Sequence, residues 1–392
     1  MTGLGGELAR VDALVRQGQL GPAADLLDRL LLAGTDSAAH WLQLAGLRRA
    51  LRQPRRALDA VHRALAIAPL DFMGLVMRAA LLERIDPSAA GKAWDEALAQ
   101  RPEGELPPPL AATVARGEEL HAEWSRARED RLVRASGQSG EDRKANLTEQ
   151  SPDADRDRRI ARFRSNVLRK TRVFHSEPTH FHYPGLPERE FHPSHRFAWL
   201  KRFADATDAI RAEALALVQS GRAELIPYLQ YREHEALAQW QALNNNLDWG
   251  ALHLLKEGTR IDANADACPV TMELLSHVPQ PRIAGASPNA LFSLLAPRTA
   301  IPPHVGVSNA RLLCHVPVDS PSGCWFRVGA ETRFWKAGEP FVFDDTIEHE
   351  AANPSDRLRI VLIFDLWHPD LDAVERDAIA GIIAAEGAEG AL

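Results

Sequence analysis

Small and large apolar residues recur at a fixed spacing in the first hundred residues of the chain. The recurring positions are Ala23, Leu27 and Leu30, then Ala57, Val61 and Ala64, then Ala90, Trp94 and Ala97. The period is 33 to 34 residues. Small residues at helical spacing let two helices approach closely, while larger residues fill the groove between them. The pattern predicts three helix pairs, of which the outer two are less regular.

This pattern resembles the tetratricopeptide repeat, in which a large residue, small residues and a closing proline recur at set places. Trp41, Ala45 and Pro69 complete the central copy, and Pro102 closes the next. An ordinary helical bundle rich in Ala and Leu is the alternative, but a bundle has no reason to keep this register twice. Stacked helix pairs offer a groove for a peptide or partner helix, or they brace a neighbouring domain. We assign residues 1–134 to this helical domain.

Polar sequence separates the repeats from the rest of the chain. The stretch ASGQSGEDRKANLTEQSPDAD has few apolar residues, which is typical of an exposed linker. The arginine-dense segment that follows places Ile160, Phe163 and Val167 at helical spacing. A solvated amphipathic helix is favoured over an arm that binds nucleic acid. Residues 135–172 are therefore interpreted as a linker and a helix.

Residues 173–392 have the pattern of a β-rich domain. A helix is expected over about 204–220, and short β-type runs begin beyond Asp248, separated by Gly, Pro and Asn. Apolar residues alternate with others in ARLLCHVPV, FVFDD and RIVLIFDLW, which predicts strands joined by turns at PSG, KAGEP and NPSDR. Such strands pack as two facing sheets, a sandwich or jelly roll. The fold class expected for the whole chain is α+β with several domains.

Composition narrows the classes of protein that remain. The 392 residues are 45% apolar and 25% charged, and no apolar run is long enough for a membrane span. The first residues lack the features of a secretory signal, so a cytoplasmic location is expected. A net charge of −7 argues against general affinity for nucleic acid. Cys268, Cys314 and Cys324 are interpreted as reduced, buried thiols.

Three polar residues interrupt the apolar strands of the β-rich domain. His304 precedes one predicted strand, His349 lies 45 residues later near a turn, and Arg359 follows ten residues after it. Two imidazoles from different strands bind Fe(II) well and leave coordination positions open for oxygen. A guanidinium inside an apolar strand requires an anion, which a dicarboxylate supplies through a bidentate pair. An ion pair of Arg359 with Asp356 or Asp365 is the ordinary alternative. The joint occurrence of two histidines and an arginine in predicted strands favours a site for a metal and an anion.

The same region resembles the aspartyl/asparaginyl β-hydroxylases, a family of Fe(II)- and 2-oxoglutarate-dependent oxygenases. The resemblance rests on PHVGVSNARLLCH, GCWFRVGAETRFW, FDDTIEHEA and RIVLIFDLWHPDL, and it covers about residues 188–375. It implies a double-stranded β-helix in which His304 and His349 bind iron and Arg359 binds the distal carboxylate of 2-oxoglutarate. Most related oxygenases carry an acidic third ligand where this chain has Gly306. The β-hydroxylase branch lacks that carboxylate, so the glycine agrees with it.

Further positions match residues with which the family contacts its cosubstrate. The resemblance implies that Ser293 hydrogen-bonds the same end of 2-oxoglutarate as Arg359. It also implies that Trp249 and His315 contact the cosubstrate, and that the stretch from Leu313 through Cys314 to His315 lines it.

One departure from the family changes the expected binding. Animal members carry an arginine at the position of Leu313, so one of the residues with which they bind the cosubstrate is absent here. Arg311 remains and is a candidate for binding either the cosubstrate or the carboxylate of the substrate. The sequence leaves that choice open.

The function implied by the resemblance is hydroxylation at the β-carbon of Asp or Asn residues in a peptide or protein. Fe(II) is the implied cofactor, 2-oxoglutarate and O₂ are the cosubstrates, and the helical repeats are a candidate surface for presenting the substrate. Neither nucleic acid nor a membrane is expected as a partner. Two alternatives stay open: hydroxylation of a non-peptide substrate such as a lipid acyl chain, and an inactive tetratricopeptide scaffold.

Overall fold

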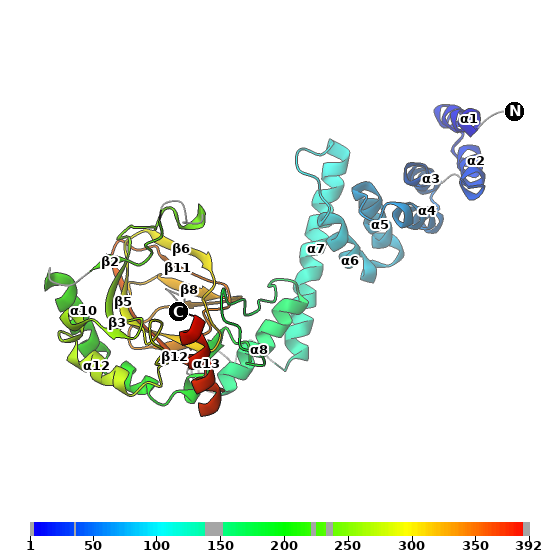
Figure 1. The fold of residues 1–392 in the computed structure, drawn as a ribbon. Helices are drawn as coiled ribbons and strands as arrows, with labels where there is room; N and C mark the ends of the chain where they lie inside the picture. Colours follow the sequence, from blue (N-terminus) through cyan, green and yellow to red (C-terminus); the bar gives the residue numbers. More distant parts are fainter. Residues whose placement is uncertain (1–3, 35–36, 138–151, 221–224, 233–237, 387–392) are drawn as a thin grey trace. The chain divides into compact units, whose positions relative to one another are not determined.

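The structure is a computed structural model that describes residues 4–34, 37–137, 152–220, 225–232 and 238–386. It divides into two compact units, residues 1–140 and 141–392 (Figure 1). Most of the predicted linker, 138–151, lies outside the described residues. Within the described ranges, no helix has both the length and the apolar character that a membrane crossing requires.

The first unit consists of helices. They are α1 (Leu4–Arg16), α2 (Leu20–Leu32), α3 (Ala38–Ala50), α4 (Pro54–Ile67), α5 (Phe72–Ile85), α6 (Pro87–Leu98) and α7 (Pro108–Ala135). Side-chain caps mark several starts: Ser37 accepts from the backbone N–H of His40, and Asp71 from that of Gly74. The predicted helical repeat of tetratricopeptide type is confirmed, because consecutive helices pair in antiparallel fashion along the chain.

The small residues of the repeat lie where its helices meet. Ala57, Val61 and Ala64 of α4 are buried, as are Trp94 and Ala97 of α6. In total, one cluster of buried apolar side chains runs through this unit from α1 to α7. Helices α6 and α7 of this cluster approach each other closely. A Cβ atom at Gly117 would lie 2.4 Å from the ring of Trp94, so only glycine permits this approach.

Helix α8 (Pro152–Val167) belongs to the second unit. The predicted helix is present, but its apolar positions are not a buried stripe. Phe163 is 70% exposed and Val167 is 39% exposed, while Ile160 is half-buried. One contact between α8 and the rest of this unit is polar: Arg162 Nη1 lies 2.8 Å from Glu190 Oε1.

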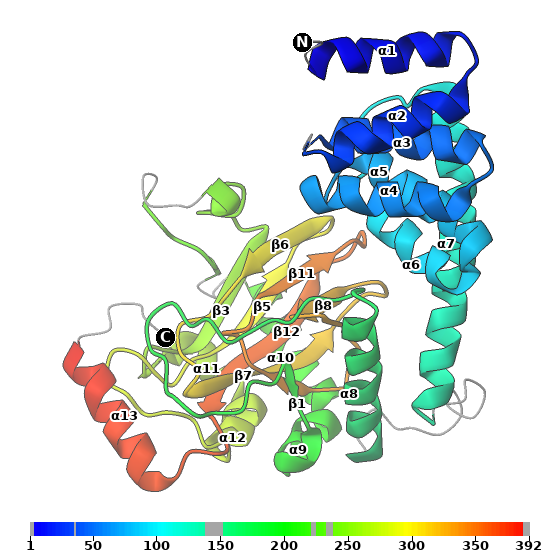
Figure 2. The same ribbon diagram turned by 90° about the vertical axis from the view of Figure 1, so that its right-hand side faces the viewer.

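The second unit is built on two antiparallel sheets. The larger has the strand order β1–β10–β7–β12–β5–β3–β2 with β4 beside β3, and the smaller has the order β6–β11–β8–β9 (Figure 2). The strands are β1 (Phe191–His192), β2 (Ile226–Pro227), β3 (Trp249–Lys256), β4 (Thr259–Arg260), β5 (Ala290–Leu295), β6 (Thr299–His304), β7 (Arg311–Asp319), β8 (Trp325–Val328), β9 (Glu331–Phe334), β10 (Phe341–Phe343), β11 (His349–Asn353) and β12 (Arg359–Trp367). This is the predicted jelly-roll sandwich.

Each face of the larger sheet is covered differently. Helices α9 (Leu200–Asp205), α10 (Thr207–Ser220) and α12 (Pro269–Ser276) pack on its outer face around one apolar cluster. A second, aromatic-rich cluster fills the space between the two sheets. Among the described residues, the remaining α-helices of this unit are α11 (Asp262–Ala265) and α13 (Ala373–Glu386). The single helix expected over 204–220 is instead broken at Ala206, where the Thr207 hydroxyl bonds the carbonyls of Phe203 and Ala204.

Candidate metal centre

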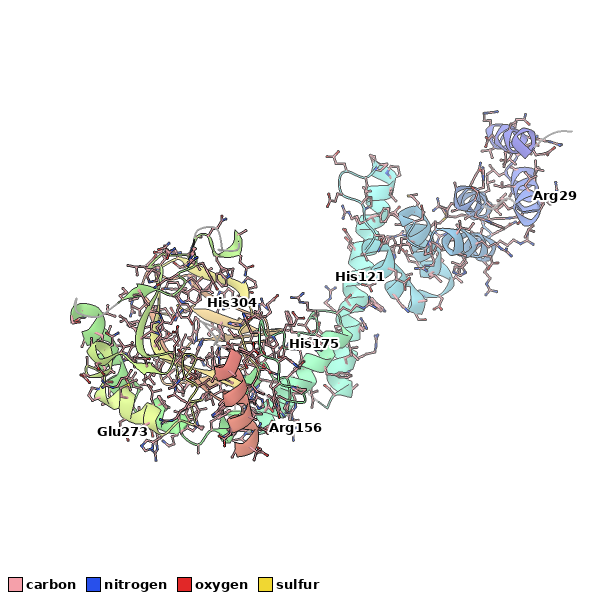
Figure 3. The ribbon with its side chains drawn as sticks, viewed as in Figure 1. Arg29, His121, Arg156, His175, Glu273 and His304 are labelled. Atoms are coloured by element: carbon pink, nitrogen blue, oxygen red, sulfur yellow. The ribbon has the colours of Figure 1, made fainter. Side chains whose placement is uncertain are left out.

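Two histidines meet across neighbouring strands of the smaller sheet. His304 ends β6 and His349 begins β11, and the two residues are paired in the antiparallel register. Their ring centroids are 4.0 Å apart (Figure 3 labels His304). His349 is buried and His304 is half-buried. Residues that are 45 positions apart in sequence are thus neighbours because their strands pair directly.

The hydrogen bonds of both imidazoles suit a metal ligand. His304 Nδ1 lies 2.8 Å from the carbonyl oxygen of Pro302, and His349 Nδ1 lies 3.1 Å from that of Ile347. A carbonyl only accepts, so each Nδ1 carries the hydrogen and each Nε2 keeps its lone pair. Burial lowers the pKa of His304 to about 3 and that of His349 to about 4, so both rings are neutral. The two residues therefore fit a divalent metal ion.

Asp345 occupies the space that a side chain at position 306 would need. A Cβ atom built at Gly306 would lie 2.1 Å from Asp345 Oδ2. The backbone N–H of Gly306 also donates to the Asp345 carbonyl at 2.6 Å. Asp345 is buried and forms an ion pair with Arg311, whose Nη2 lies 3.2 Å from Oδ2. Asp345 was not predicted as a site residue, because its position beside Gly306 depends on how two distant loops meet.

A guanidinium lies in the aromatic-rich core between the sheets. Arg359, which begins β12, is 1% exposed, and its Nη1 donates to Ser293 Oγ at 3.2 Å. Trp249 Nε1 donates to the same hydroxyl oxygen at 3.2 Å. Because Ser293 Oγ already accepts two hydrogen bonds, its own O–H is left to donate to a ligand. Burial lowers the pKa of Arg359 to about 9, so the group is still charged at neutral pH.

Aromatic rings surround these polar groups. The Arg359 guanidinium lies over the ring of Trp335, 4.6 Å from its centroid. Trp240 packs edge-on against His304 at 5.1 Å, and Tyr228 stacks on Trp249 at 4.0 Å. Trp335, Trp240 and Tyr228 were missed at the sequence level. Their aromatic character alone does not separate a site wall from an ordinary core.

Strand β7 places its predicted residues on opposite faces. Arg311, Leu313 and His315 face the space between the sheets, where His315 contacts Phe326 at 4.8 Å between ring centroids. Cys314 points the other way, into the cluster covered by the helices. The sequence analysis expected Cys314 to line the cosubstrate together with Leu313 and His315. The structure corrects this for the side chain: side chains alternate along a strand, so that of Cys314 does not share a face with those of its two neighbours.

Two hollows elsewhere in the molecule do not involve this cluster. One, of about 530 Å³, lies between α8 and the β9 region, and the other, of about 550 Å³, is lined by α2, α3 and α4. Charged groups on their walls pair with each other, as Arg48 does with Asp25 and Asp28 in the second. The histidine pair and Arg359 line neither.

Comparisons with known proteins match the second unit. Residues 204–369 match the family model described as Aspartyl/Asparaginyl beta-hydroxylase. The chain is 35% identical over 140 residues to Aspartate beta-hydroxylase domain-containing protein 2 of Homo sapiens, covering 35% of this chain and 38% of that protein. It is 29% identical over 175 residues to the Aspartyl/asparaginyl beta-hydroxylase of Homo sapiens, covering 44% of this chain and 21% of that protein. The matches thus span well under half the length of these relatives.

Solved structures overlap with parts of the chain. The Sgt2 TPR domain from Aspergillus fumigatus covers 40% of it at 13% identity with a TM-score of 0.26. The Cnp3 cupin domain of Schizosaccharomyces pombe covers 24% at 12% identity with a TM-score of 0.20. Scores this low carry no argument about function.

Proposed function

Because residues 204–369 match the family model described as Aspartyl/Asparaginyl beta-hydroxylase, we propose that the protein hydroxylates its substrate with iron(II), 2-oxoglutarate and O₂. The substrate proposed is an Asp or Asn residue of a peptide or protein, modified at the β-carbon. The sum of the reaction is balanced: 2-oxoglutarate, O₂ and a C–H bond give succinate, CO₂ and an alcohol.

The observation that carries the proposal is the arrangement of His304 and His349. Both rings are neutral, lie side by side and have their Nδ1 atoms held by backbone carbonyls. Each therefore offers the Nε2 lone pair to one metal ion. Neither imidazole carries a charge, so these two residues would hold iron(II) without neutralising it, which would favour an anionic cosubstrate.

Arg359, Ser293 and Trp249 would hold the far end of that cosubstrate. The guanidinium provides charge, and the Ser293 hydroxyl provides a hydrogen that neither neighbour uses. Trp335 packs under the guanidinium and fixes its plane. His315 reaches the same space from β7 and would complete this wall.

When bound, iron(II) with 2-oxoglutarate and O₂ supplies the oxidation of the C–H bond. The protein residues bind and orient the reactants. Trp240 and Tyr228 line the His304 side of the site, where they would exclude water and leave the C–H bond of the substrate as the nearest reactive group.

The test is turnover of 2-oxoglutarate to succinate in air with added iron(II). We expect the parent protein to form succinate and His349→Ala to lose at least about 90% of the rate, because one of two metal ligands is removed. Arg359→Lys should raise the KM for 2-oxoglutarate at least about tenfold, because lysine cannot bind a carboxylate bidentately.

A matched control is His277→Ala, at a histidine on the outer surface whose side chain is 48% exposed. It should keep the parent rate. Equal succinate formation by the parent and His349→Ala proteins would contradict the proposal and favour a non-catalytic scaffold.

A further inference from the structure

Residues 174–183 run alongside the two loops that flank the candidate metal ligands, and we call this segment the strap. One loop, residues 305–310, follows His304, and the other, residues 344–348, precedes His349. The strap belongs to the second unit, but it precedes the residues that match the family model. None of the residues proposed to bind metal or cosubstrate lies in it.

The strap donates backbone hydrogen bonds to the loop after His304. The N–H of Thr179 donates to the carbonyl of Gly306 at 3.0 Å, and the N–H of Phe181 donates to that of Val307 at 2.9 Å. Gly306 is only two residues after the histidine. The strap therefore fixes the backbone next to one candidate metal ligand.

The same segment also bonds the loop before the second histidine. The N–H of Glu177 donates to the carbonyl of Thr346 at 2.8 Å, and the hydroxyl oxygens of Ser176 and Thr346 lie 2.7 Å apart. The next carbonyl along the loop, that of Ile347, lies 3.1 Å from His349 Nδ1, which donates to it. The strap thus holds the residue beside the carbonyl that orients the ring of His349.

The carboxyl end of the strap is anchored by a side chain of the first loop. Asn309, which is 4% exposed, bonds both backbone groups of Tyr183: its Oδ1 accepts from the N–H at 2.7 Å, and its Nδ2 donates to the carbonyl at 2.9 Å. The Tyr183 hydroxyl donates to Glu375 Oε1 of α13 at 2.8 Å. A segment that is held at its end in this way can keep two separate loops in place.

A metal ion binds most tightly where its ligands are already held in the binding geometry. Groups that orient the ligands without touching the metal typically change its affinity by about 10–100-fold. We propose that the strap is a positioning element, whose backbone N–H groups at residues 177 and 179 hold both loops so that His304 and His349 meet one metal ion. This inference rests on the proposed function, because it concerns the same metal centre.

The experiment removes one N–H group at a time from the full-length protein. Glu177→Pro and Thr179→Pro do so, because proline has no backbone N–H. Glu177 already precedes Pro178, which favours the extended conformations that proline also accepts. Co(II) is titrated into each protein under nitrogen and followed by visible absorption. We expect the dissociation constant of Co(II) to rise at least about tenfold in each proline variant.

Glu177→Ala and Thr179→Ala are the matched controls. They shorten the same exposed side chains but keep the N–H groups, so their dissociation constants should equal that of the parent protein. The melting temperature without metal is measured for all variants. A segment with a merely structural role would lower this temperature and leave the Co(II) affinity of the folded protein unchanged.

A milder variant decides the question if the proline variants do not fold. Ser176→Ala removes the hydroxyl contact with Thr346 and leaves the backbone intact. It should raise the dissociation constant of Co(II) at least about twofold, as expected for the loss of one hydrogen bond. Ser276→Ala, the same change at an exposed serine of α12, should have no effect. Equal Co(II) affinity of Ser176→Ala and the parent would then overturn the proposal.

The outcomes separate this inference from the proposed function. Folded proline variants that bind Co(II) as tightly as the parent overturn the inference and leave the proposed function standing. Equal weakening by the alanine and proline variants also overturns it, because the side chains and not the N–H groups would then be responsible. A parent spectrum that His349→Ala leaves unchanged would contradict the proposed metal centre, and this inference with it.

Discussion

At position 306 the protein has no room for a side chain. The carboxylate of Asp345 fills that space and is held there by Arg311. The glycine two residues after His304, a candidate metal ligand, is therefore a packing requirement. The Asp345 carboxylate, which comes from the segment between β10 and β11, lies where the Cβ of a residue at position 306 would be.

We predict that Gly306→Ala destabilises the second unit by about 1–3 kcal/mol, because the added methyl overlaps a buried, ion-paired carboxylate. Urea unfolding followed by tryptophan fluorescence measures the free energy of unfolding. The control is Gly381→Ala in α13, where nothing lies within 4 Å, and it should stabilise by up to about 1 kcal/mol. An unchanged midpoint for Gly306→Ala would mean that Asp345 moves aside at little cost.

A second pair of histidines makes the stability of the second unit depend on pH. His192 is buried, and its ring lies 5.2 Å from that of His368. Burial lowers the pKa of His192 to about 3, and the nearby charges of Arg189 and Arg196 act in the same direction against the weaker effect of Asp370. The folded protein therefore keeps this ring neutral where the unfolded chain would protonate it.

The sign of the effect follows from that difference. His192 contributes stability above the unfolded pKa of about 6.5, and the contribution is lost as pH falls from there toward 3. Between pH 7 and pH 5 the loss amounts to about 2 kcal/mol. We predict that His192→Phe makes the free energy of unfolding less sensitive to this pH change by about that amount, while His277→Phe does not. Parallel pH profiles for parent and His192→Phe proteins would count against a neutral buried His192.

At the residue scale, sequence reasoning reached those site residues whose type is unusual for their surroundings. Histidine and arginine in apolar strands stood out, and the structure brings His304, His349 and Arg359 into the space between the sheets. Their roles as ligands stay predictions. Asp345 and Trp335 were missed because acidic and aromatic residues are common, and only the fold reveals what they contact.

At the scale of elements, periodicity predicted helices and strands well where one face of each is buried. The repeat of small residues marks the helix pairs of the first unit, and β12 was visible as a continuous apolar run because both of its faces are buried. Short strands such as β1 depend on tertiary contacts that no local pattern encodes. The break between α9 and α10 is local, since the Thr207 hydroxyl bonds the carbonyls of Phe203 and Ala204, but the apolar periodicity did not predict it.

We predict that Gly117→Ala in α7 destabilises the first unit by about 1–3 kcal/mol, because the new Cβ would meet the Trp94 ring of α6. The comparison is Gly46→Ala in α3, which has nothing within 4 Å and should stabilise by up to about 1 kcal/mol, since alanine is the better helix former. Loss of ellipticity at 222 nm with temperature measures both. A stabilised Gly117→Ala protein would show that α6 and α7 can separate without penalty.

At the scale of the whole molecule, each of the two units has its own hydrophobic core. The apolar cluster of the first lies within residues 1–140, and those of the second lie within 141–392. Every predicted site residue belongs to the second unit. Helix α8 also belongs there, although the sequence suggested a boundary at about residue 173.

The last prediction uses this division. Residues 141–392 produced alone should turn over 2-oxoglutarate at the rate of the full chain, because all groups that would hold metal and cosubstrate are included. Residues 173–392 should melt at least about 3 °C lower, since they lack α8 and the ion pair of Arg162 with Glu190. Glu190 also accepts from the backbone N–H of Ala330 at 2.8 Å, so leaving this half-buried carboxylate without its cation weakens the turn between β8 and β9. Melting curves of both fragments, with succinate assays beside the full chain, measure these effects. A loss of turnover in residues 141–392 would mean that the helical repeats contribute to catalysis rather than only to binding or bracing.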